Sequence, residues 1–249
     1  LGSRGLGDVY KRQDPVLSCL GSQYAGWSLS FVQNDDNFSA LGSGPCRALA
    51  GKEDIFKDIG YEDKFFSTVV VLEVDQKPPQ EIIDKIVSDC NISEKNLSVI
   101  LTPTRSLCGT TQVVGRVLEV GLHKVHELGF PIDKVVDGFG SAPLPPPAPD
   151  FLIGMGRTND AILYGGLVHL YVDTPNDDAE ELAKRLPSST SKDYGKPFAD
   201  IFKEYKYDFY QIDKMLFSPA KVIVSSLKTG KSYTSGNIDL SLMDNSFNK

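Results

Sequence analysis

Five side chains able to exchange protons or bind ligands recur at helical spacing between Thr110 and Leu128. At about 100° per residue they fall within roughly 80° of one another, and they are Gln112, Arg116, Glu119, His123 and His126. Valines and leucines occupy the opposite side, so the spacing predicts one amphipathic helix over 110–128. Glu119, close to Arg116, is a candidate general acid/base with a charge partner that tunes it. The alternative is an ordinary solvated helix face.

The same polar stripe has a second interpretation as a metal site. Glu119, His123 and His126 present three potential ligands from consecutive turns. One helix rarely completes a tetrahedral site alone, and the remaining histidine, His169, lies in a strand pattern. We therefore expect no metal, and a metal-dependent hydrolase that uses these three residues stays as an alternative.

Four loops rich in glycine, hydroxyl and amide groups, each with a basic residue, are candidate ligand-binding segments. Backbone N–H groups in such loops and at helix N-termini bind anionic or carbonyl groups. None has the spacing of a P-loop or of GxGxxG, and each is compatible with a turn or cap. The sequence thus favours a binder of a polar, partly anionic small molecule. The candidate binding residues are Gly42, Ser43, Gly44, Arg47, Thr110, Thr111, Gln112, Arg157, Asn159, Asp160, Ser189 and Lys192.

Strands alternate with helices along the chain, which predicts an α/β fold. In the first half, strands are expected at 65–75 and 96–103, with helices at 78–88 and 110–128. In the second half, the patterns predict strands at 161–164 and 167–173, a helix at 176–184, a helix with Phe198, Ile201, Phe202 and Tyr205 on one side, and a closing hairpin around 228–230.

A proline-rich stretch, 141–150, is the best candidate for a domain junction. It would divide a first α/β domain, 14–140, from a second, 151–249. An exposed loop or a docking peptide are the alternatives. Residues 1–13 have no helical or strand period, so we expect a non-native tail, a native sequence that begins near Asp14, and a first domain truncated at its N-terminus.

Composition excludes several classes of protein. The 249 residues carry a net charge of −7, which argues against a chain that wraps nucleic acid or lies on anionic lipid. Apolar runs end within a few residues, far short of the roughly 20 that a membrane span needs. The four cysteines form no CxxC pair, so we expect free thiols and a cytoplasmic protein.

Long stretches of the chain resemble methenyltetrahydromethanopterin cyclohydrolases. The matching strings cover most of the chain from about Leu17 to Gly236, and they include GSGPCRALA, SLCGTTQVVGRVLEVGLHKVHELGFP, DGFGSAPLPPPAPDF, MGRTNDAILYGGLVHLYV and LPSSTSKDYGKPFADIFKEYKYDFYQID. The chain departs from the family at Cys46 and Cys108, where small residues are more usual, and at QNDDN near Asn34, an expected loop insertion.

The resemblance implies a hydrolase of one-carbon metabolism, in methanogenesis or in methane or methyl oxidation. Such an enzyme interconverts the N5,N10-methenyl pterin and its N5-formyl form by adding water. It also implies a two-domain α/β fold with a substrate pocket between the domains, a homotrimer, and no cofactor beyond the pterin carrier. The catalytic Glu and Arg of the family fall on Glu119, the expected proton shuttle, and on Arg116, which would tune it. A non-catalytic pterin-binding protein is the remaining alternative.

The chemistry of the substrate agrees with these residue types. The methenyl bridge is a cationic amidinium, so a negative Glu119 suits it. The anionic tail of the carrier is expected to meet Arg47, Arg157, Lys192 or Lys196.

Overall fold

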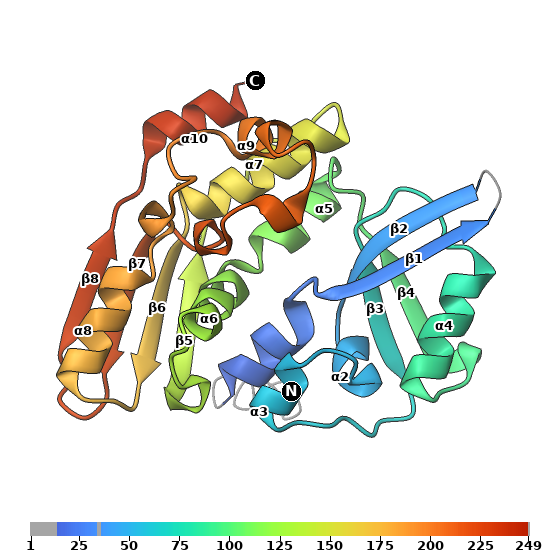
Figure 1. The fold of residues 1–249 in the computed structure, drawn as a ribbon, viewed down its shortest axis with the longest axis horizontal. Helices are drawn as coiled ribbons and strands as arrows, with labels where there is room; N and C mark the ends of the chain where they lie inside the picture. The colour runs from blue at the N-terminus through green and yellow to red at the C-terminus, as the bar shows by residue number, and fades with distance from the viewer. Residues whose placement is uncertain (1–13, 34–35, 249) are drawn as a thin grey trace, which may run out of the picture.

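Two four-stranded sheets with helices packed on them make up the fold (Figure 1), in a computed structural model that describes residues 14–33 and 36–248. The predicted α/β class is confirmed. The expected tail 1–13 lies outside the described residues, and so do Asn34 and Asp35 of the expected insertion. Among the described residues, no helix combines the length and the apolar character that crossing a membrane demands.

The first sheet has the strand order β1-β2-β3-β4, with the last pair parallel and the others antiparallel. Its core forms where buried side chains of β1 and β3, such as Leu29 and Leu72, meet Ile82 and Ile86 of the helix α4. The elements of this half are β1 (Trp27–Gln33), β2 (Asp36–Ser43), α2 (Cys46–Ala50), α3 (Ile55–Ile59), β3 (Thr68–Leu72), α4 (Gln80–Cys90), η2 (Glu94–Asn96) and β4 (Leu97–Leu101).

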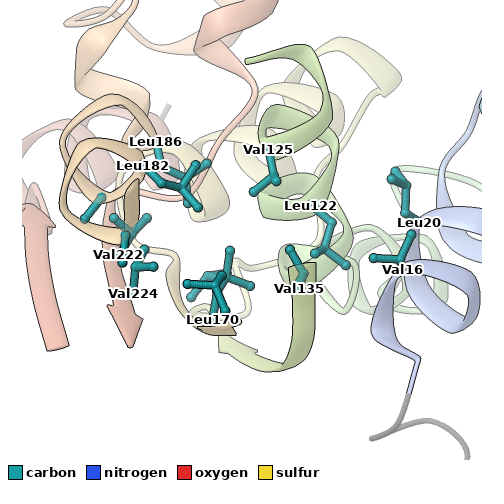
Figure 2. Packing of buried hydrophobic residues seen from close by; sticks show 14 of the residues in the cluster. Val16, Leu20, Leu122, Val125, Val135, Leu170, Leu182, Leu186, Val222 and Val224 are labelled. Carbon is teal, nitrogen blue, oxygen red and sulfur yellow. The ribbon is translucent and has the colours of Figure 1, made fainter. Parts of the chain in front are cut away.

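The second sheet has the order β5-β6-β7-β8, in which only β6 and β7 run parallel. Side chains alternate between the two faces of a strand, and in β6 every second residue, from Val168 to Val172, is buried. These residues pack against α6 and α8 on one face of the sheet, as Figure 2 shows for Leu122 and Leu182. The elements are η3 (Ile132–Lys134), β5 (Val135–Ser141), β6 (Leu167–Val172), α8 (Asn176–Arg185), η4 (Ser188–Thr190), β7 (Lys221–Ser226) and β8 (Ser232–Gly236).

A third cluster of buried side chains, which includes Tyr164, Phe198 and Phe202, joins the helices beyond the end of the second sheet. Those helices are α7 (Phe151–Leu163), α9 (Phe198–Glu204) and α10 (Leu240–Phe247), with the short turns η5 (Phe209–Gln211) and η6 (Lys214–Leu216). Helix α5 (Leu107–Val114) packs against α7.

The N-terminal turn η1 (Val16–Gly21) links the two halves of the molecule. The chain leads from this turn directly into β1 of the first sheet. Val16 and Leu20 nevertheless pack in the core of the second sheet, next to Leu122 of α6 (Figure 2). The segment after η1 therefore crosses from one core to the other.

The helix predicted over 110–128 is two helices, so that prediction was wrong. Helix α5 ends at Val114, and α6 (Val117–Glu127) begins after Gly115 and Arg116. Glycine favours helix termination, since its backbone has the most freedom to lose. The Arg116 N–H bonds to the carbonyl of Val113, three residues back, which closes the first helix with a tighter turn.

The strand predicted at 161–164 was also wrong. These residues form the last turn of α7 and its cap, and all four are almost completely buried. A short apolar run before two glycines fits a buried strand and a buried helix end equally well. The strands and helices predicted at 65–75, 78–88, 96–103, 167–173, 176–184 and around 198–205, and the closing hairpin, are confirmed within a few residues.

The proline-rich stretch 141–150 lies inside the second half of the molecule. Strand β5 before it pairs with β6 after it, and Arg157 Nη1 donates to the carbonyl oxygens of Pro146 and Pro147 at 3.3 and 2.8 Å. The chain passes from one sheet to the other between β4 and β5. The 141–150 junction therefore does not coincide with the change of sheet, and independently folding domains stay a prediction.

Lys124 of α6 is completely buried. Its ammonium donates to the carbonyl oxygens of Pro187 and Met215, both at 2.7 Å, and to Thr190 Oγ1 at 2.8 Å. One side chain thus holds η4 and η6 against α6.

Candidate active site

Glu119 lies in the first turn of α6, where Val117 and Leu122 face the second core. Its side chain is buried, with only 3% of the residue exposed. Burial raises the pKa of Glu119 to about 7, with Glu73 also raising it and Arg116 and Arg47 opposing the rise. Among the described residues no hydrogen bond contributes to that pKa. The carboxyl group is therefore poised to take up and release a proton near neutral pH.

Arg116 stands at the N-cap of α6 and is held from the first sheet. Its Nη2 donates to Glu73, which follows β3 directly. Its Nη1 donates to the carbonyl oxygen of Gln23 at 3.2 Å. The break between α5 and α6 puts Arg116 at a helix start, where it reaches across to the other half of the molecule.

Glu73 and Tyr24 belong to this site, and the sequence analysis missed both. Glu73 interrupts the apolar run at the end of β3, which was an available signal. The Tyr24 ring lies 4.7 Å from the ring of His123 and 5.1 Å from Cζ of Arg47. Burial and the charge of Glu119 raise the pKa of Tyr24. No local pattern marks Tyr24, because its neighbours come from distant parts of the chain.

The three possible ligands of the metal interpretation do not converge. His126 Nε2 lies 3.0 Å from a carboxylate oxygen of Asp58 on α3, whereas His123 Nε2 lies 3.8 Å from Glu127. Within 14–33 and 36–248, no group of three or more His, Cys, Asp or Glu side chains is placed to hold a metal ion. The geometry thus gives this alternative no support.

His123→Ala and His126→Ala are therefore expected to lower turnover only a few-fold, since neither ring is arranged as a ligand or as the acid/base. Steady-state rates of both variants, with and without a chelator, check this. Loss of activity in both, together with rescue of the chelated parent by zinc or iron, would favour the metal-dependent hydrolase instead.

The predicted binding residues of β2 and α2 lie beside the site. Gly44 has φ 103°, and its N–H donates to the Ser22 carbonyl at 2.6 Å. A side chain there would meet the Val69 carbonyl oxygen at 2.7 Å, so only glycine fits without a shift. Gly42 and Ser43 pair with β3. Arg47 is bound by Glu53.

The predicted residues on α5 have mixed environments. The hydroxyl groups of Thr110 and Thr111 donate to carbonyls of their own helix, Ser106 and Leu107. Gln112 Nε2 is buried and has no hydrogen-bond partner within the described part of the chain. An unpaired buried amide is costly, so Gln112 is the α5 residue with unused capacity for a ligand.

Three of the four remaining predicted residues make hydrogen bonds within the second half of the molecule. Asn159 Nδ2 donates to the Met155 carbonyl at 2.9 Å, and Asp160 Oδ1 accepts from the Phe198 N–H at 2.9 Å. Ser189 is exposed, and the Lys192 N–H donates to Asp213. Their binding role stays a prediction.

Glu119→Gln is expected to change the pH dependence of stability. The folded state holds the Glu119 proton up to a pH of about 7, whereas the unfolded chain releases it near 4.5. This group therefore lowers the stability of the parent as pH rises from about 4.5 through 7, by about 3 kcal/mol in all. Urea unfolding at pH 5 and pH 8 should show Gln at position 119 stabilising at pH 8 and nearly neutral at pH 5. An equal effect at both pH values contradicts the assignment.

A buried carboxyl group of near-neutral pKa next to an arginine is typical of enzymes that use acid–base catalysis. The model of one family, Cyclohydrolase (MCH), matches residues 9–247, and the chain belongs to that family. Relatives named methenyltetrahydromethanopterin cyclohydrolase confirm the resemblance. That of Methylobacillus flagellatus is 60% identical over 234 residues, which are 94% of this chain and 70% of the relative.

Two further relatives with the same name match in the same way. The protein of Methylophilus methylotrophus is 60% identical over 168 residues, or 68% of this chain and 96% of the relative. That of Rhodopirellula baltica is 44% identical over 250 residues, or 98% of this chain and 73% of the relative. This chain is therefore a hydrolase of the class that opens cyclic amidines, with a role in one-carbon metabolism.

Proposed function

We propose that this chain adds water reversibly to N5,N10-methenyltetrahydromethanopterin and forms the N5-formyl compound, with Glu119 as the proton shuttle. The names of the relatives support the substrate. The buried Glu119 carboxyl group, with a pKa raised to about 7, is the observation that carries the mechanism.

The reaction needs one group that accepts a proton and then returns it. A water oxygen bonds to the electrophilic methenyl carbon, and Glu119 takes a proton from that water. The same carboxyl group then donates the proton to N10 as the C–N10 bond breaks, which leaves the formyl group on N5. The second proton of the attacking water is released to solvent. A group of near-neutral pKa serves both steps, since neither transfer is then steeply uphill.

Arg116 is proposed to set the pKa of Glu119 rather than to exchange protons itself. Of the charges that lower the pKa of Glu119, Arg116 has the largest effect. Glu73 and the Gln23 carbonyl keep the guanidinium in place.

Arg116→Ala is accordingly expected to raise the pKa of Glu119 above about 7 and to move the corresponding limb of the pH–rate profile to higher pH. Rates measured from pH 5 to pH 10 check this prediction. An unchanged limb, whatever the loss in rate, would show that Arg116 does not tune the shuttle.

The remaining parts of the proposal concern binding and assembly. Gln112 is suited to a carbonyl or ring nitrogen of the pterin, while Arg157, Lys192 and Lys196 are candidates for the anionic tail. Lys196 is exposed and pairs with Glu204 at 2.8 Å. The resemblance to the family further supports a pocket between the two halves, a homotrimer, no cofactor beyond the pterin carrier, and a cytoplasmic location.

Mixing the purified chain with the methenyl substrate and following the methenyl absorption tests the function. Decay of the absorption, unchanged by a chelator, is the expected result. Binding of the substrate without decay would instead define a pterin-binding protein without catalytic activity. Decay that the chelator abolishes would define a metal-dependent enzyme.

A further inference from the structure

Arg47 is a buried arginine of α2, and all three of its guanidinium nitrogens donate hydrogen bonds within the protein. Nε and Nη2 donate to the two carboxylate oxygens of Glu53 at 2.7 and 2.6 Å. Nη1 donates to the carbonyl oxygens of Leu20 at 3.1 Å and Gly21 at 2.9 Å. Since the side chain has no exposed surface, Arg47 is committed to holding the end of η1.

The next two carbonyl groups of the same segment are also bound. The Ser22 carbonyl accepts from the Gly44 N–H at 2.6 Å. The Gln23 carbonyl accepts from Arg116 Nη1 at 3.2 Å. Four consecutive carbonyl groups, 20–23, thus receive hydrogen bonds, three from the region around α2 and one from the N-cap of α6.

Aromatic side chains also connect Arg47 with α6. Cζ of Arg47 lies 5.1 Å from the ring centroid of Tyr24 and 5.4 Å from that of Phe56. Tyr24 also contacts the ring of His123 on α6, one turn beyond Glu119. A desolvated arginine attracts the face of an aromatic ring, so Arg47 also helps to fix the ring that packs on α6.

We propose that Arg47 is a positioning residue for Arg116, which it holds in place through the segment Leu20–Tyr24. Arg47 fixes the Leu20 and Gly21 carbonyls and thereby the nearby Gln23 carbonyl, which in turn orients Arg116 through its hydrogen bond. The inference rests on the proposed function for its kinetic consequence only. It competes with the prediction that Arg47 binds the substrate, because the guanidinium that would meet an anionic tail is already bound to Glu53.

The test is a double-mutant cycle in which Arg47→Lys and Arg116→Ala are combined, with the pKa of Glu119 as the first readout. The charged groups that act on Glu119 are Arg116, Arg47 and Glu73, and the Tyr24 hydroxyl is a further titratable neighbour. Lysine keeps the positive charge at position 47 but loses the fork that binds Glu53 and the two carbonyls. Titration by 13C NMR, assigned with Glu119→Gln, follows the carboxyl group whether or not the protein turns over substrate.

Arg47→Lys alone is expected to raise the pKa of Glu119 by roughly half a unit to one unit and to lower kcat roughly 10-fold with little change in KM. In the Arg116→Ala background the same substitution should add almost nothing, because no guanidinium remains to be positioned. Glu53→Gln, which keeps Arg47 intact but weakens its anchor, should give a smaller change of the same kind if Arg47→Lys folds poorly.

Arg157→Lys is the matched control. Arg157 also donates from Nη1 to two consecutive backbone carbonyl groups, but those carbonyls do not lead to Arg116. Whatever its own effect, it should combine additively with Arg116→Ala.

Two results would overturn the proposal. Equal effects of Arg47→Lys in both backgrounds would mean that Arg47 acts on Glu119 directly. A rise in KM alone would make Arg47 a substrate contact. If the parent does not turn over the methenyl substrate, the proposed function is wrong. The double-mutant cycle on the pKa of Glu119 then still tests the positioning role of Arg47.

Discussion

Glu119→Gln is expected to slow turnover by roughly 100-fold to 10,000-fold, the range for loss of a general acid/base. The amide has nearly the shape of the carboxyl group but cannot carry a proton from water to N10. Burial of Glu119 strengthens the expectation, since solvent has little access to replace the missing group. Single-turnover decay of the methenyl absorption measures the chemical step without interference from product release.

Glu127→Gln is the matched control for that experiment. It makes the same substitution on the same helix, at the last residue of α6, where the carboxylate faces His123 and Lys214. Its rate should stay within a few-fold of the parent. A Glu119→Gln rate equally close to the parent would return Glu119 to a structural role and remove the proposed shuttle.

Lys124→Met is expected to lower the free energy of unfolding by about 2 kcal/mol. Methionine fills a similar volume, and removal of a buried charge is favourable in itself, since burial lowers the pKa of Lys124 to about 7. The loss comes mainly from the Met215 carbonyl, which accepts from the ammonium at 2.7 Å. The Pro187 carbonyl still accepts from the Thr190 N–H at 3.1 Å and from the Thr190 hydroxyl at 2.8 Å. Each buried acceptor left unpaired costs about 1–3 kcal/mol.

Urea unfolding of Lys124→Met and Lys214→Met shows whether the loss of buried hydrogen bonds outweighs the gain from removing a buried charge. Lys214 is mostly exposed and pairs with Glu127 at 3.4 Å, so its replacement should change the free energy by less than about 0.5 kcal/mol. If Lys124→Met is no more destabilising than Lys214→Met, the buried hydrogen bonds of Lys124 contribute no net stability.

The sequence was sufficient for the α/β class and for placing Arg116 near enough for its charge to act on Glu119, because periodicity is a local property. It was insufficient wherever one short run permits two structures. The polar stripe predicted one continuous helix, but the helix breaks at Gly115. The buried run 161–164, predicted as a strand, forms a helix end. Part of the predicted stripe is present in the structure, since Glu119 and His123 lie on α6 and Arg116 is its N-cap residue.

The partners that give Glu119 its chemistry were harder to find from the sequence. Glu73 and Tyr24 reach the site from β3 and from the segment after η1. The glycine-rich loop before Arg47 made it a candidate ligand contact, but its ion pair with Glu53 forms only when α2 packs and buries the guanidinium. Such contacts join residues far apart in sequence or depend on burial, and neither is visible in a local pattern.

The path of the N-terminal segment has a consequence for the order in which the molecule assembles. The Gln23 carbonyl and Arg116 are separated by 93 residues. Val16 and Leu20 pack in a core that includes Val222 and Val224 of β7 (Figure 2). Contacts this distant in sequence form late, because the intervening chain must first lose its freedom. During synthesis these early residues must wait for the C-terminal sheet before they are covered. Catalytic competence is therefore acquired late in folding, once the segment 16–24 is covered by strands made about 200 residues later.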